Sequence, residues 1–520
     1  MNAPRTITPG LSGVPDSVDV VVVGLGVTGA GVALDAASRG LSVLAVDAFD
    51  LAWGTSRFSS KLVHGGLRYL ASGQVGIAHE SAVERGILME TTAPHLTRPL
   101  PTIVPLAAGV TRPMGLLTRA GLFGGDLLRR AAGTSADTLP KPRRLTAAET
   151  RRLAPTLRAD GLRGAVLGWD GQLEDDARLV TTIARTAAAR GAAVHTHARV
   201  LAAAGTSVEL RDELTGETRT VRTRTVINAA GVWAGDVAGD IRLRPSRGTH
   251  VVLRGDVLPG LNVAVFAPIP GERNRYVLVL PQPDGQIYVG LTDEPADGPV
   301  PDVAEPTEVE IGFLLDVVAA SFSRPLRRSD VVGAFAGLRP LLDTGDDATA
   351  DLSRKHAVLT SPDGVVTIVG GKLTTYRRMA EDAVDAAVAH AGLYAGPCVT
   401  ATLPLAGAAP RVQLAELIER AETPGHARLA RRFGTDAALV LDTARTVTGL
   451  PDEDLLAPIA ESIPVTLAEL VFGVTHEGAA DVADLLDRRT RVGLVPADRA
   501  LAVPAAERAL ELVQESPVDR

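Results

Sequence analysis

The sequence predicts an α/β protein that combines a discontinuous α/β domain, an antiparallel-sheet domain and an all-helical C-terminal domain. Residues 18–46 contain a strand, a glycine-rich turn, a helix and a second strand in succession, which is the pattern of a βαβ unit. A strand that enters a glycine pair and a helix reappears much later, at residues 365–387. Between them, residues 250–292 carry short alternating runs separated by turn residues, a pattern typical of antiparallel sheet. We therefore expect the α/β domain to be interrupted by an inserted sheet.

The first βαβ unit is defined by clear start and stop signals. Val18 to Val23 is rich in β-branched residues, and an alanine-rich helical stretch follows the glycines as far as Arg39. Gly40 is expected to end that helix, and Leu41 to Val46 forms the second apolar strand.

The middle of the chain contains a second helix-then-strand pattern and then turn-separated strands. We expect a helix at residues 176–190, a strand at 192–201 and, after a turn at 214–217, a strand at 225–228. The runs Tyr276 to Leu280 and Gln286 to Val289 are separated by Pro283-Asp284-Gly285, whose residue types favour a turn.

The chain beyond Pro410 is expected to be helical, with prolines that break it into pieces. Residues 412–420 and 479–488 have helical patterns, and Pro451, Pro464 and Pro496 interrupt the region. Because 520 residues exceed what one hydrophobic core organises, three domains are reasonable. The expected ranges are 17–95, 150–240 and 330–392 for the discontinuous α/β domain, 96–149 and 241–329 for the substrate or cap domain, and 405–520 for the helical domain.

Composition excludes several classes of function. The chain has 46% hydrophobic and 22% charged residues and a formal net charge of −8, so it lacks the basic field that nucleic acid requires. The single cysteine, Cys398, cannot form an internal disulfide or a thiolate metal cluster, and the histidines and acids show no paired ligand spacing, so no metal site is expected. No secretory leader or membrane span is expected, and the cytoplasm is the expected location.

A glycine fingerprint between the first strand and the first helix predicts a dinucleotide site. Gly24, Gly26 and Gly29 permit a tight turn and let the backbone approach a pyrophosphate at the helix N-terminus. Asp47 ends the second strand, where an acid can accept a hydrogen bond from a ribose hydroxyl. The fingerprint alone does not separate NAD from FAD.

The segment after Asp47 indicates a larger ligand. Residues 50–70 mix small, hydroxyl and glycine residues with histidine, arginine and lysine. Such a segment can supply backbone N–H groups and hydroxyls to a second phosphate and can pass close to a flat ring. An ordinary long loop is the alternative interpretation.

Four segments together resemble one family. These are residues 64–70 (HGGLRYL), 226–233 (VINAAGVW), 337–341 (GLRPL) and 370–377 (GGKLTTYR). They resemble the signatures of FAD-dependent glycerol-3-phosphate dehydrogenases, and similar segments extend over most of the chain. The resemblance implies a glutathione-reductase-like FAD-binding domain, a sheet-based substrate domain and a helical C-terminal domain.

The resemblance also implies which residues hold FAD. Asp47 stands where flavin enzymes of this type usually have Glu, and Trp53 is bulky beside Gly54. A shorter carboxylate still accepts from a ribose hydroxyl, so the first departure is mild. The implied FAD-binding residues are Gly24, Gly26, Gly29, Asp47, Thr55, Ser56, Ser60, Lys61, Leu62, Gly231, Gly370 and Gly371.

Oxidation of glycerol 3-phosphate needs a hydride acceptor, a proton acceptor and cations for a phosphate near −2. Arginine suits the phosphate because its planar fork matches two oxygens, whereas lysine acts as a point charge. His250 is the leading candidate for the proton acceptor, with a hydrogen-bonded sheet histidine as the alternative. The expected catalytic residues are His250, Arg339 and Lys372, and the expected substrate-binding residues are Arg68, Tyr69, Arg354 and Thr375.

The resemblance predicts oxidation of sn-glycerol 3-phosphate to dihydroxyacetone phosphate, with electrons passed from FAD to a membrane quinone. Residues 113–132 could form a basic amphipathic surface segment that contacts the inner face of the cell membrane peripherally, although packing inside the protein is the favoured interpretation. The chain is also expected to form a homodimer. The alternatives are an oxygen-using glycerol-3-phosphate oxidase, an FAD amine or amino-acid oxidase, and a non-catalytic nucleotide-binding module.

Overall fold

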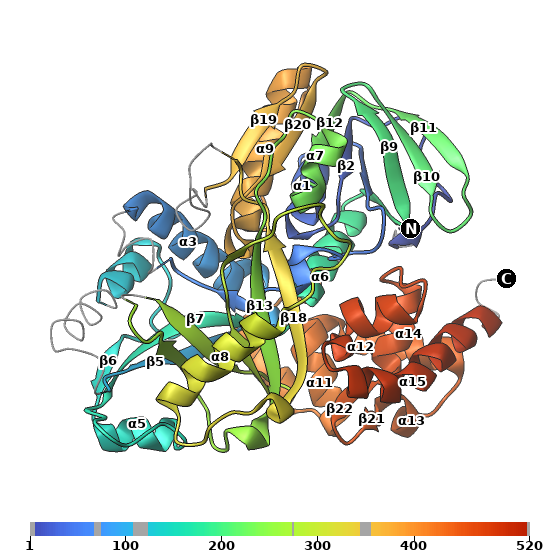
Figure 1. The fold of residues 1–520 in the computed structure, drawn as a ribbon. Helices are drawn as coiled ribbons and strands as arrows, with labels where there is room; N and C mark the ends of the chain where they lie inside the picture. The colour runs from blue at the N-terminus through green and yellow to red at the C-terminus, as the bar shows by residue number, and fades with distance from the viewer. Residues whose placement is uncertain (1–5, 67–73, 108–122, 273–274, 344–354, 517–520) are drawn as a thin grey trace.

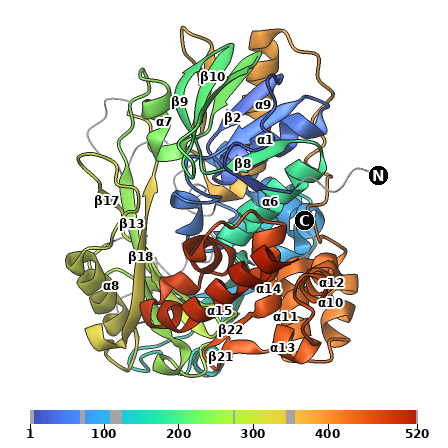
Figure 2. The same ribbon diagram turned by 90° about the vertical axis from the view of Figure 1, so that its right-hand side faces the viewer.

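The structure is a computed structural model, and it describes residues 6–66, 74–107, 123–272, 275–343 and 355–516. Figure 1 shows three regions: an α/β region at the top, a large sheet at the lower left and a helical region at the lower right. In Figure 2 the helical C-terminal region lies below the α/β region and beside strands β13 and β18. The predicted arrangement of an α/β domain, a sheet domain and a C-terminal helical domain is confirmed.

A seven-stranded sheet forms the centre of the α/β domain. Its strand order is β1-β8-β3-β2-β12-β20-β19, and the described pairs are parallel except for β19, which runs antiparallel to β20. The predicted strands at residues 225–228 and 365–369 are β12 and β20, so segments far apart in sequence share one sheet. The strands are β1 (Thr8–Pro9), β8 (Ala193–Thr196), β3 (Val43–Val46), β2 (Val20–Val23), β12 (Thr225–Asn228), β20 (Val365–Val369) and β19 (Ala357–Thr360).

Each face of this sheet is buried against a different layer. Val20 and Val22 of β2 pack with the helices, whereas Val21 and Val23 pack with a small antiparallel sheet, because successive side chains point to opposite faces. Helix α1 packs against both other helices of its layer. The helices are α1 (Val27–Ser38), α6 (Asp176–Ala189) and α9 (Tyr376–Ala391), and the small sheet contains β9 (Ala198–Ala204), β10 (Ser207–Asp212) and β11 (Thr218–Arg222).

A ten-stranded sheet forms the second domain. Its order is β17-β13-β16-β15-β14-β5-β7-β4, with β18 also paired to β13 and β6 to β7. The expected antiparallel pairing is observed except between β14 and β5, which are parallel. Helix α8 (Glu308–Ser321) packs on one face. The strands are β4 (Leu62–Val63), β5 (Thr97–Pro105), β6 (Arg143–Leu145), β7 (Ala165–Leu173), β13 (Ser246–Arg254), β14 (Ala264–Pro268), β15 (Tyr276–Pro281), β16 (Gln286–Gly290), β17 (Glu294–Pro295) and β18 (Val331–Arg339).

The membership of this sheet differs from the expected domain ranges. Strands β4, β7 and β18 lie in ranges predicted for the α/β domain. Strand β7 pairs antiparallel with β5 from end to end, and β18 pairs with β13 over nearly its whole length. These partners are far away in sequence, so no local pattern indicates which sheet the strands join.

The C-terminal domain is helical except for one short hairpin. Strands β21 (Pro458–Ala460) and β22 (Ile463–Thr466) form a two-stranded sheet where the sequence predicted only helix. The helix expected at residues 479–488 is present from residue 482, and it has a wide turn over Asp484–Arg489. The helices are α10 (Arg411–Glu419), α11 (Pro424–Phe433), α12 (Ala437–Thr448), α13 (Asp452–Leu456), α14 (Leu467–Thr475) and α15 (Pro496–Glu515).

Further helices in the described ranges include α3 (Val75–Ile87) and α5 (Ala147–Leu153), which lie between strands of the ten-stranded sheet, and α7 (Ala234–Val237), which lies between β12 and β13 and so links the two sheets. The predicted amphipathic segment at 113–132 lies partly outside the described residues. Within its described part, Leu128 packs against Ala78 and Ala82 of α3, while Phe123 and Leu127 are 52% and 68% exposed. None of the helices in the described ranges has the length and apolarity needed to cross a bilayer.

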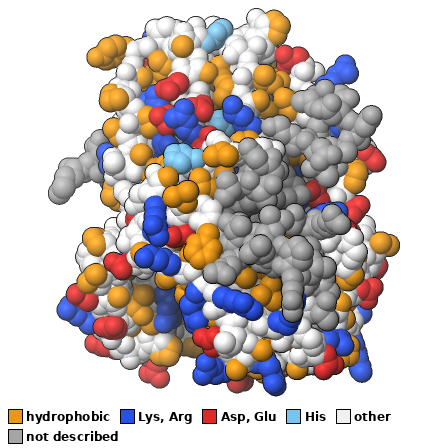
Figure 3. Space-filling view, turned by 90° about the vertical axis from the view of Figure 1, so that its left-hand side faces the viewer, with side chains coloured by type: hydrophobic (Ala, Val, Ile, Leu, Met, Phe, Trp, Pro, Cys, Tyr) orange, Lys and Arg blue, Asp and Glu red, His pale blue; other side chains and the backbone are white. Residues whose placement is uncertain are grey.

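Charge is mixed on the surface that Figure 3 displays. Basic and acidic side chains are interspersed over this face, with hydrophobic side chains between them. A mixed distribution is expected for a chain with 53 basic and 61 acidic residues.

Candidate active site

A cavity of about 1330 Å³ lies between the α/β domain and the ten-stranded sheet. Its lining comes from the glycine turn before α1, the segment after β3, the sheet strands β13 and β18, and the segment before α9. Pockets for drug-sized ligands usually measure about 300–1,000 Å³. The cavity is therefore large enough for a dinucleotide together with a small substrate.

The glycine fingerprint forms one end of this cavity. Gly24 has φ +95°, a conformation that side chains rarely adopt, and a Cβ on Gly29 would overlap the carbonyl oxygen of Gly24. Gly26 is the N-cap of α1 and lines the cavity, so the first turn of the helix faces the open space. A pyrophosphate fits there because the unpaired N–H groups and the dipole of a helix N-terminus favour anions. Gly29 does not line the cavity and acts through helix packing.

Asp47 lines the same end of the cavity as the glycine fingerprint. It follows β3 directly, and its carboxylate accepts hydrogen bonds from the backbone N–H groups of Leu25 at 2.6 Å and Phe49 at 2.9 Å. Burial raises the pKa of Asp47 to about 6. An ionised carboxylate offers about four acceptor positions, so two backbone bonds leave capacity for a ribose hydroxyl.

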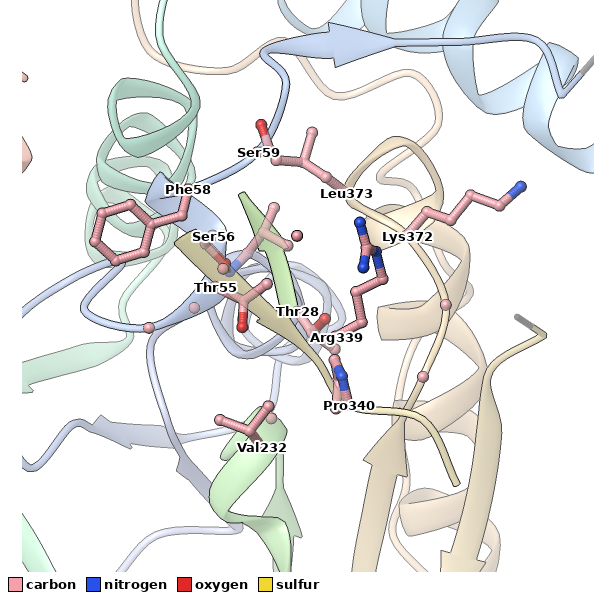
Figure 4. Close-up of a pocket in the computed structure, with 18 of the residues that line it drawn as sticks. Thr28, Thr55, Ser56, Phe58, Ser59, Val232, Arg339, Pro340, Lys372 and Leu373 are labelled. Atoms are coloured by element: carbon pink, nitrogen blue, oxygen red, sulfur yellow. Dashed lines mark hydrogen bonds between the residues drawn. The ribbon is translucent and has the colours of Figure 1, made fainter. Parts of the chain in front are cut away.

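The segment that we call the FAD-binding loop, residues 49–62, forms one wall of the cavity. Ser56 accepts a hydrogen bond from the N–H of Val27 at 2.9 Å, which ties the loop to the start of α1. Figure 4 shows Thr55 and Ser56 close to Thr28, with Val232 on another wall. Thr55 donates to the carbonyl of Leu338 and so links the loop to β18. Of the expected cofactor residues in this loop, the cavity is lined by Thr55, Ser56, Ser60 and Leu62.

Lys61 does not line the cavity, although the resemblance placed it among the FAD-binding residues. Its φ is +57° and its side chain is fully buried behind the loop, where the ammonium donates to Asp176 at 2.8 Å and to the carbonyl of Arg57 at 2.6 Å. Burial lowers the pKa of Lys61, while Asp176 opposes that shift. Lys61 thus anchors the loop from behind.

Trp53 is the bulky residue at which the sequence departs from the family pattern, and it is accommodated by stacking on Phe49. Its ring lies 4.3 Å from that of Phe49, and its indole N–H donates to the carbonyl of Asp302 at 3.1 Å. Gly54 is needed beside it, because a Cβ there would lie 2.8 Å from the ring of Trp233.

Three more of the predicted glycines form part of the cavity wall. Gly231, Gly370 and Gly371 line the cavity and have φ values of +61°, +79° and +71°. A Cβ on Gly371 would also overlap the sulfur of Met379. A flat ring fits against such a wall because the backbone has no side chains that would hold the ring away.

Arg339 lines the cavity where β18 ends. It ends β18, and its Nη1 donates to Ser246 and to Asp293, each at 3.1 Å, while its Nη2 donates to the carbonyl of Thr292 at 3.1 Å. Gly248 makes room for the guanidinium, because a Cβ there would overlap Nη2. The fork of Arg339 is thus held in one orientation at the cavity wall.

Lys372 lines the same cavity but extends in another direction. Its ammonium donates to Ser81 of α3 at 2.8 Å, and Figure 4 shows the side chain pointing away from the guanidinium of Arg339. Thr375 is buried at the start of α9 and does not line the cavity. Its neighbour Thr374 does, and accepts a hydrogen bond from the N–H of His64 at 3.3 Å.

His250 lies on β13, deep in the cavity wall, and is 1% exposed. Its Nε2 is 2.9 Å from the hydroxyl of Ser60, and its ring stacks on Phe335 with centroids 4.8 Å apart. No hydrogen-bond partner for Nδ1 occurs among the residues that the structure describes. Burial, followed by the charges of Lys61 and Arg339, lowers the pKa of His250 to about 3. The imidazole is therefore neutral at pH 7.

The structure brings most of the predicted site residues together. His250, Arg339 and Lys372 share one cavity with Gly24, Gly26 and Asp47. The substrate-binding residues Arg68, Tyr69 and Arg354 lie outside the described residues.

Sequence reasoning missed three polar residues of the site. Thr292 and Asp293, which orient Arg339, lie two and three residues after the end of β16 at Gly290. Their place just beyond the end of a strand was the available signal in the sequence. Thr374 is the neighbour of the predicted Thr375 in a 3₁₀ turn. Adjacent side chains of such a turn point to different faces, so one threonine lines the cavity and the other does not. The contact between Ser60 and His250 had no signal, because 190 residues separate them.

Comparisons with known proteins agree with this geometry. The family model described as FAD dependent oxidoreductase matches residues 19–377, and the C-terminal domain of alpha-glycerophosphate oxidase matches residues 398–516. The chain is 51% identical to glycerol-3-phosphate dehydrogenase 1 of Mycobacterium tuberculosis, with 94% of each chain covered. It is 35% identical to a mitochondrial glycerol-3-phosphate dehydrogenase of Arabidopsis thaliana, with 96% of this chain and 82% of that protein covered.

A solved structure has the same fold. The glycerol-3-phosphate dehydrogenase of Bacillus halodurans, complexed with FAD, superposes with a TM-score of 0.74 at 27% identity. The match covers 96% of this chain and 92% of that one, so it includes all three domains.

Proposed function

Because this chain belongs to the family of FAD-dependent glycerol-3-phosphate dehydrogenases, we propose that it oxidises sn-glycerol 3-phosphate to dihydroxyacetone phosphate and passes the electrons to a quinone. One observation carries the proposal. A neutral histidine and a fixed arginine fork face the same cavity as a dinucleotide fingerprint. Bound FAD supplies the hydride acceptor for carbon 2 of the substrate.

The residues around the cavity fit FAD. Gly24 and Gly26 leave space for the pyrophosphate, Asp47 accepts from the ribose, and Ser56 lines the path from one to the other. The glycine wall at residues 370–371 has room for the ring system. In this proposal these residues hold the cofactor between the two sheets.

Arg339 takes the substrate phosphate. Its fork can meet two phosphate oxygens at once, and the contacts to Ser246, Asp293 and Thr292 hold it ready before substrate arrives. Lys372, Arg68 and Arg354 are proposed as the additional cations, with Tyr69 and Thr375 as hydroxyl donors.

His250 takes the proton of the C2 hydroxyl. Because its ring is 1% exposed and Nε2 meets the hydroxyl of Ser60, the proton reaches Nε2 either directly or through Ser60. The charge of Arg339 contributes to the lowered pKa of His250. A phosphate dianion bound to Arg339 cancels part of that charge, so the base becomes stronger once the substrate is in place.

Anaerobic bleaching tests the proposal. The purified protein should be yellow and should lose its flavin absorbance when glycerol 3-phosphate is added without oxygen. Glycerol 2-phosphate, which carries no free hydroxyl at C2, is the matched control and should leave the colour unchanged. Correctly folded but colourless protein, or yellow protein that glycerol 3-phosphate does not bleach, would contradict the proposal.

The electron acceptor is tested separately. We propose a quinone, so the bleached protein should regain its colour rapidly with a short-chain quinone and slowly with dissolved oxygen. The reverse order of rates would identify an oxidase instead.

The membrane and a second copy of the chain are the remaining proposed partners. Peripheral contact with the membrane is supported by the exposed Phe123 and Leu127 beside Arg130. Flotation with anionic vesicles measures this contact, and protein that stays at the bottom of the gradient would contradict it. Light scattering measures the proposed homodimer.

A further inference from the structure

We propose that residues 477–495 of the C-terminal domain, here called the C-terminal wedge, hold the FAD-binding loop, so that docking of this domain and binding of FAD are thermodynamically coupled. Arg488 and Arg489 are the positioning residues in this proposal. The inference goes beyond the proposed reaction, since it assigns a role to the helical domain.

The FAD-binding loop has one face toward the cavity and one face toward the wedge. The cavity face includes most of the loop: Phe49, Trp53, Gly54, Thr55, Ser56, Phe58, Ser59, Ser60 and Leu62. Asp50 and Lys61 do not line the cavity and are fully buried on the other face. The loop is thus held from behind by charged groups.

Asp50 of the FAD-binding loop forms ion pairs with two arginines of the wedge. Its carboxylate accepts from Arg488 Nε at 2.5 Å and from Arg489 Nη1 and Nη2 at 2.7 and 2.8 Å. All three side chains are at most 2% exposed. Arg488 also pairs with Asp484, and Arg489 donates to the carbonyl of Glu477. These charges are buried, so removal of either the loop carboxylate or the wedge guanidinium groups would leave an uncompensated buried charge and destabilise the contact.

Arg488 reaches the cavity wall through Trp53. Its guanidinium lies 4.8 Å from the centre of the indole ring, and that ring stacks on Phe49. Both aromatic rings line the cavity. A shift of Arg488 would therefore move side chains that face the cofactor.

The N-terminus of α6 forms a second bridge between the loop and the C-terminal domain. Asp176 accepts from Lys61 of the loop at 2.8 Å, and its neighbour Asp175 accepts from Arg432 of α11 at 3.2 Å. One turn later, Arg178 pairs with both carboxylate oxygens of Glu477 in the wedge. Two adjacent aspartates thus connect the loop and the helical domain.

The wedge also contacts the substrate side of the cavity. Val495 is fully buried in a cluster that includes Phe335, the residue that stacks on His250. A Cβ on Gly333 would overlap the carbonyl of Leu494, so β18 passes the wedge without a side chain in between. Figure 2 shows the C-terminal domain against both neighbouring regions, as this role requires.

Because thermodynamic linkage is reciprocal, the coupling between FAD binding and wedge docking can be measured from either event. If FAD binding needs the docked wedge, FAD must stabilise the wedge by the same factor by which the docked wedge strengthens FAD binding. We expect a factor of about 5 to 150, the range usual for coupled sites.

The first measurement is FAD release from the holoenzyme, followed by flavin fluorescence. Arg489→Lys keeps the charge but loses the fork, and Asp50→Asn keeps the shape but loses the charge. Each should raise the FAD dissociation constant by about 5-fold to 150-fold. The double variant should weaken binding by less than the product of the two single effects, because both substitutions disrupt one contact.

Leu441→Ala is the matched control. Leu441 lies on α12 and is buried in the core of the C-terminal domain, and no hydrogen bond or ion pair in the described chain joins α12 to the FAD-binding loop or to Asp175, Asp176 and Arg432. Its substitution leaves a cavity, so it should lower thermal stability and leave FAD affinity unchanged. An equal loss of FAD from Leu441→Ala would mean that general destabilisation explains the effect, and it would overturn the proposal.

The second measurement uses the unaltered protein and so does not depend on whether a variant folds. Backbone amides of residues 484–491 should exchange hydrogen more slowly with FAD bound than after FAD removal, while amides of α12 should exchange equally in both. Equal exchange in the wedge would overturn the coupling. A protein that binds FAD but shows no coupling contradicts only this inference, whereas a protein that binds no FAD contradicts the proposed function.

Discussion

The chemistry of this site depends on a few residues whose environments differ from those of free side chains. His250 is neutral because it is buried and lies near Lys61 and Arg339, and its Nε2 is held by the hydroxyl of Ser60. The two ring nitrogens are not equivalent, since Nδ1 has no hydrogen-bond partner in the described part of the chain. The hydrogen bond with Ser60 therefore fixes the orientation of the imidazole ring toward a substrate.

Ser60→Ala should slow reduction of the flavin by glycerol 3-phosphate, because His250 loses the group that orients Nε2. The loss should be smaller than the factor of about 10²–10⁴ expected when the general base itself is removed by His250→Gln. Ser60→Thr keeps a hydroxyl and should restore most of the rate. Stopped-flow absorbance under anaerobic conditions measures all three variants. Wild-type rates in Ser60→Ala would refute the role of this hydroxyl.

Arg339→Ala should leave the flavin content unchanged and raise KM for glycerol 3-phosphate. A charge-assisted hydrogen bond contributes about 1.5–3 kcal/mol, so a rise of about 10-fold to 100-fold is expected. Steady-state kinetics with a dye acceptor, normalised to bound flavin, provide the measurement. If the variant instead loses flavin and keeps normal activity per flavin, Arg339 does not bind the substrate.

At the level of secondary structure, helix α1 has to lie close to β2 for its N-terminus to face the cavity. The helix can approach because Gly29 has no side chain to collide with Gly24. The same helix packs against α6 and α9, so its position is fixed from several sides.

Gly29→Ala should displace α1 from β2, weaken FAD binding and lower thermal stability. Gly312→Ala is the matched control: Gly312 also lies within a helix, α8, and a Cβ there meets no atom of the described chain within 4 Å. That substitution should stabilise the protein by about 0.5–1 kcal/mol, because alanine favours helix more than glycine does. Thermal melts and flavin content distinguish the two. Equal effects of both substitutions would contradict the packing argument.

Local patterns predicted the elements of the α/β domain well, and they did so for a physical reason. The glycine fingerprint and the runs at residues 225–228 and 365–369 can be recognised locally, because backbone freedom is a property of glycine itself and a strand buried on both faces is a continuous apolar run. The sheet membership of β7 and β18 depends on partners far away in sequence, as does the pairing of Ser60 with His250. No periodicity carries that information.

In the wedge, the helix expected at residues 479–488 is present from residue 482, but its winding could not be predicted, for a related reason. Arg488 and Arg489 are consecutive and both buried, so both must face carboxylates at once. A regular helix turns adjacent side chains about 100° apart, and the wider turn at Asp484–Arg489 resolves that conflict.

At the scale of the whole molecule, acid should destabilise the folded protein through its buried histidines. Burial lowers the pKa of both His95 and His250 from 6.5 to about 3. Between these two values the unfolded chain binds a proton that the folded chain does not. The free energy of unfolding therefore falls, as pH falls, by about 1.4 kcal/mol per pH unit for each histidine.

Substitution of His95 isolates this effect. His95→Gln should flatten the fall in unfolding free energy between pH 6.5 and pH 4.5, measured by urea titration at each pH. Asp47, whose pKa is raised from 3.8 to about 6, acts in the opposite direction, so the difference between variant and wild type is the decisive quantity. Identical pH profiles would show that the pKa of His95 is the same in the folded and the unfolded chain, which would contradict the prediction.

The place of β20 in the seven-stranded sheet has a consequence for synthesis on the ribosome. β20 pairs with β12, yet its residues are translated about 140 positions after that strand. A nascent chain that stops short of residue 365 therefore leaves the apolar edge of Val226 and Ile227 without its neighbour. Unpaired apolar edges aggregate, so such incomplete chains should depend on chaperones until the missing strand emerges from the exit tunnel.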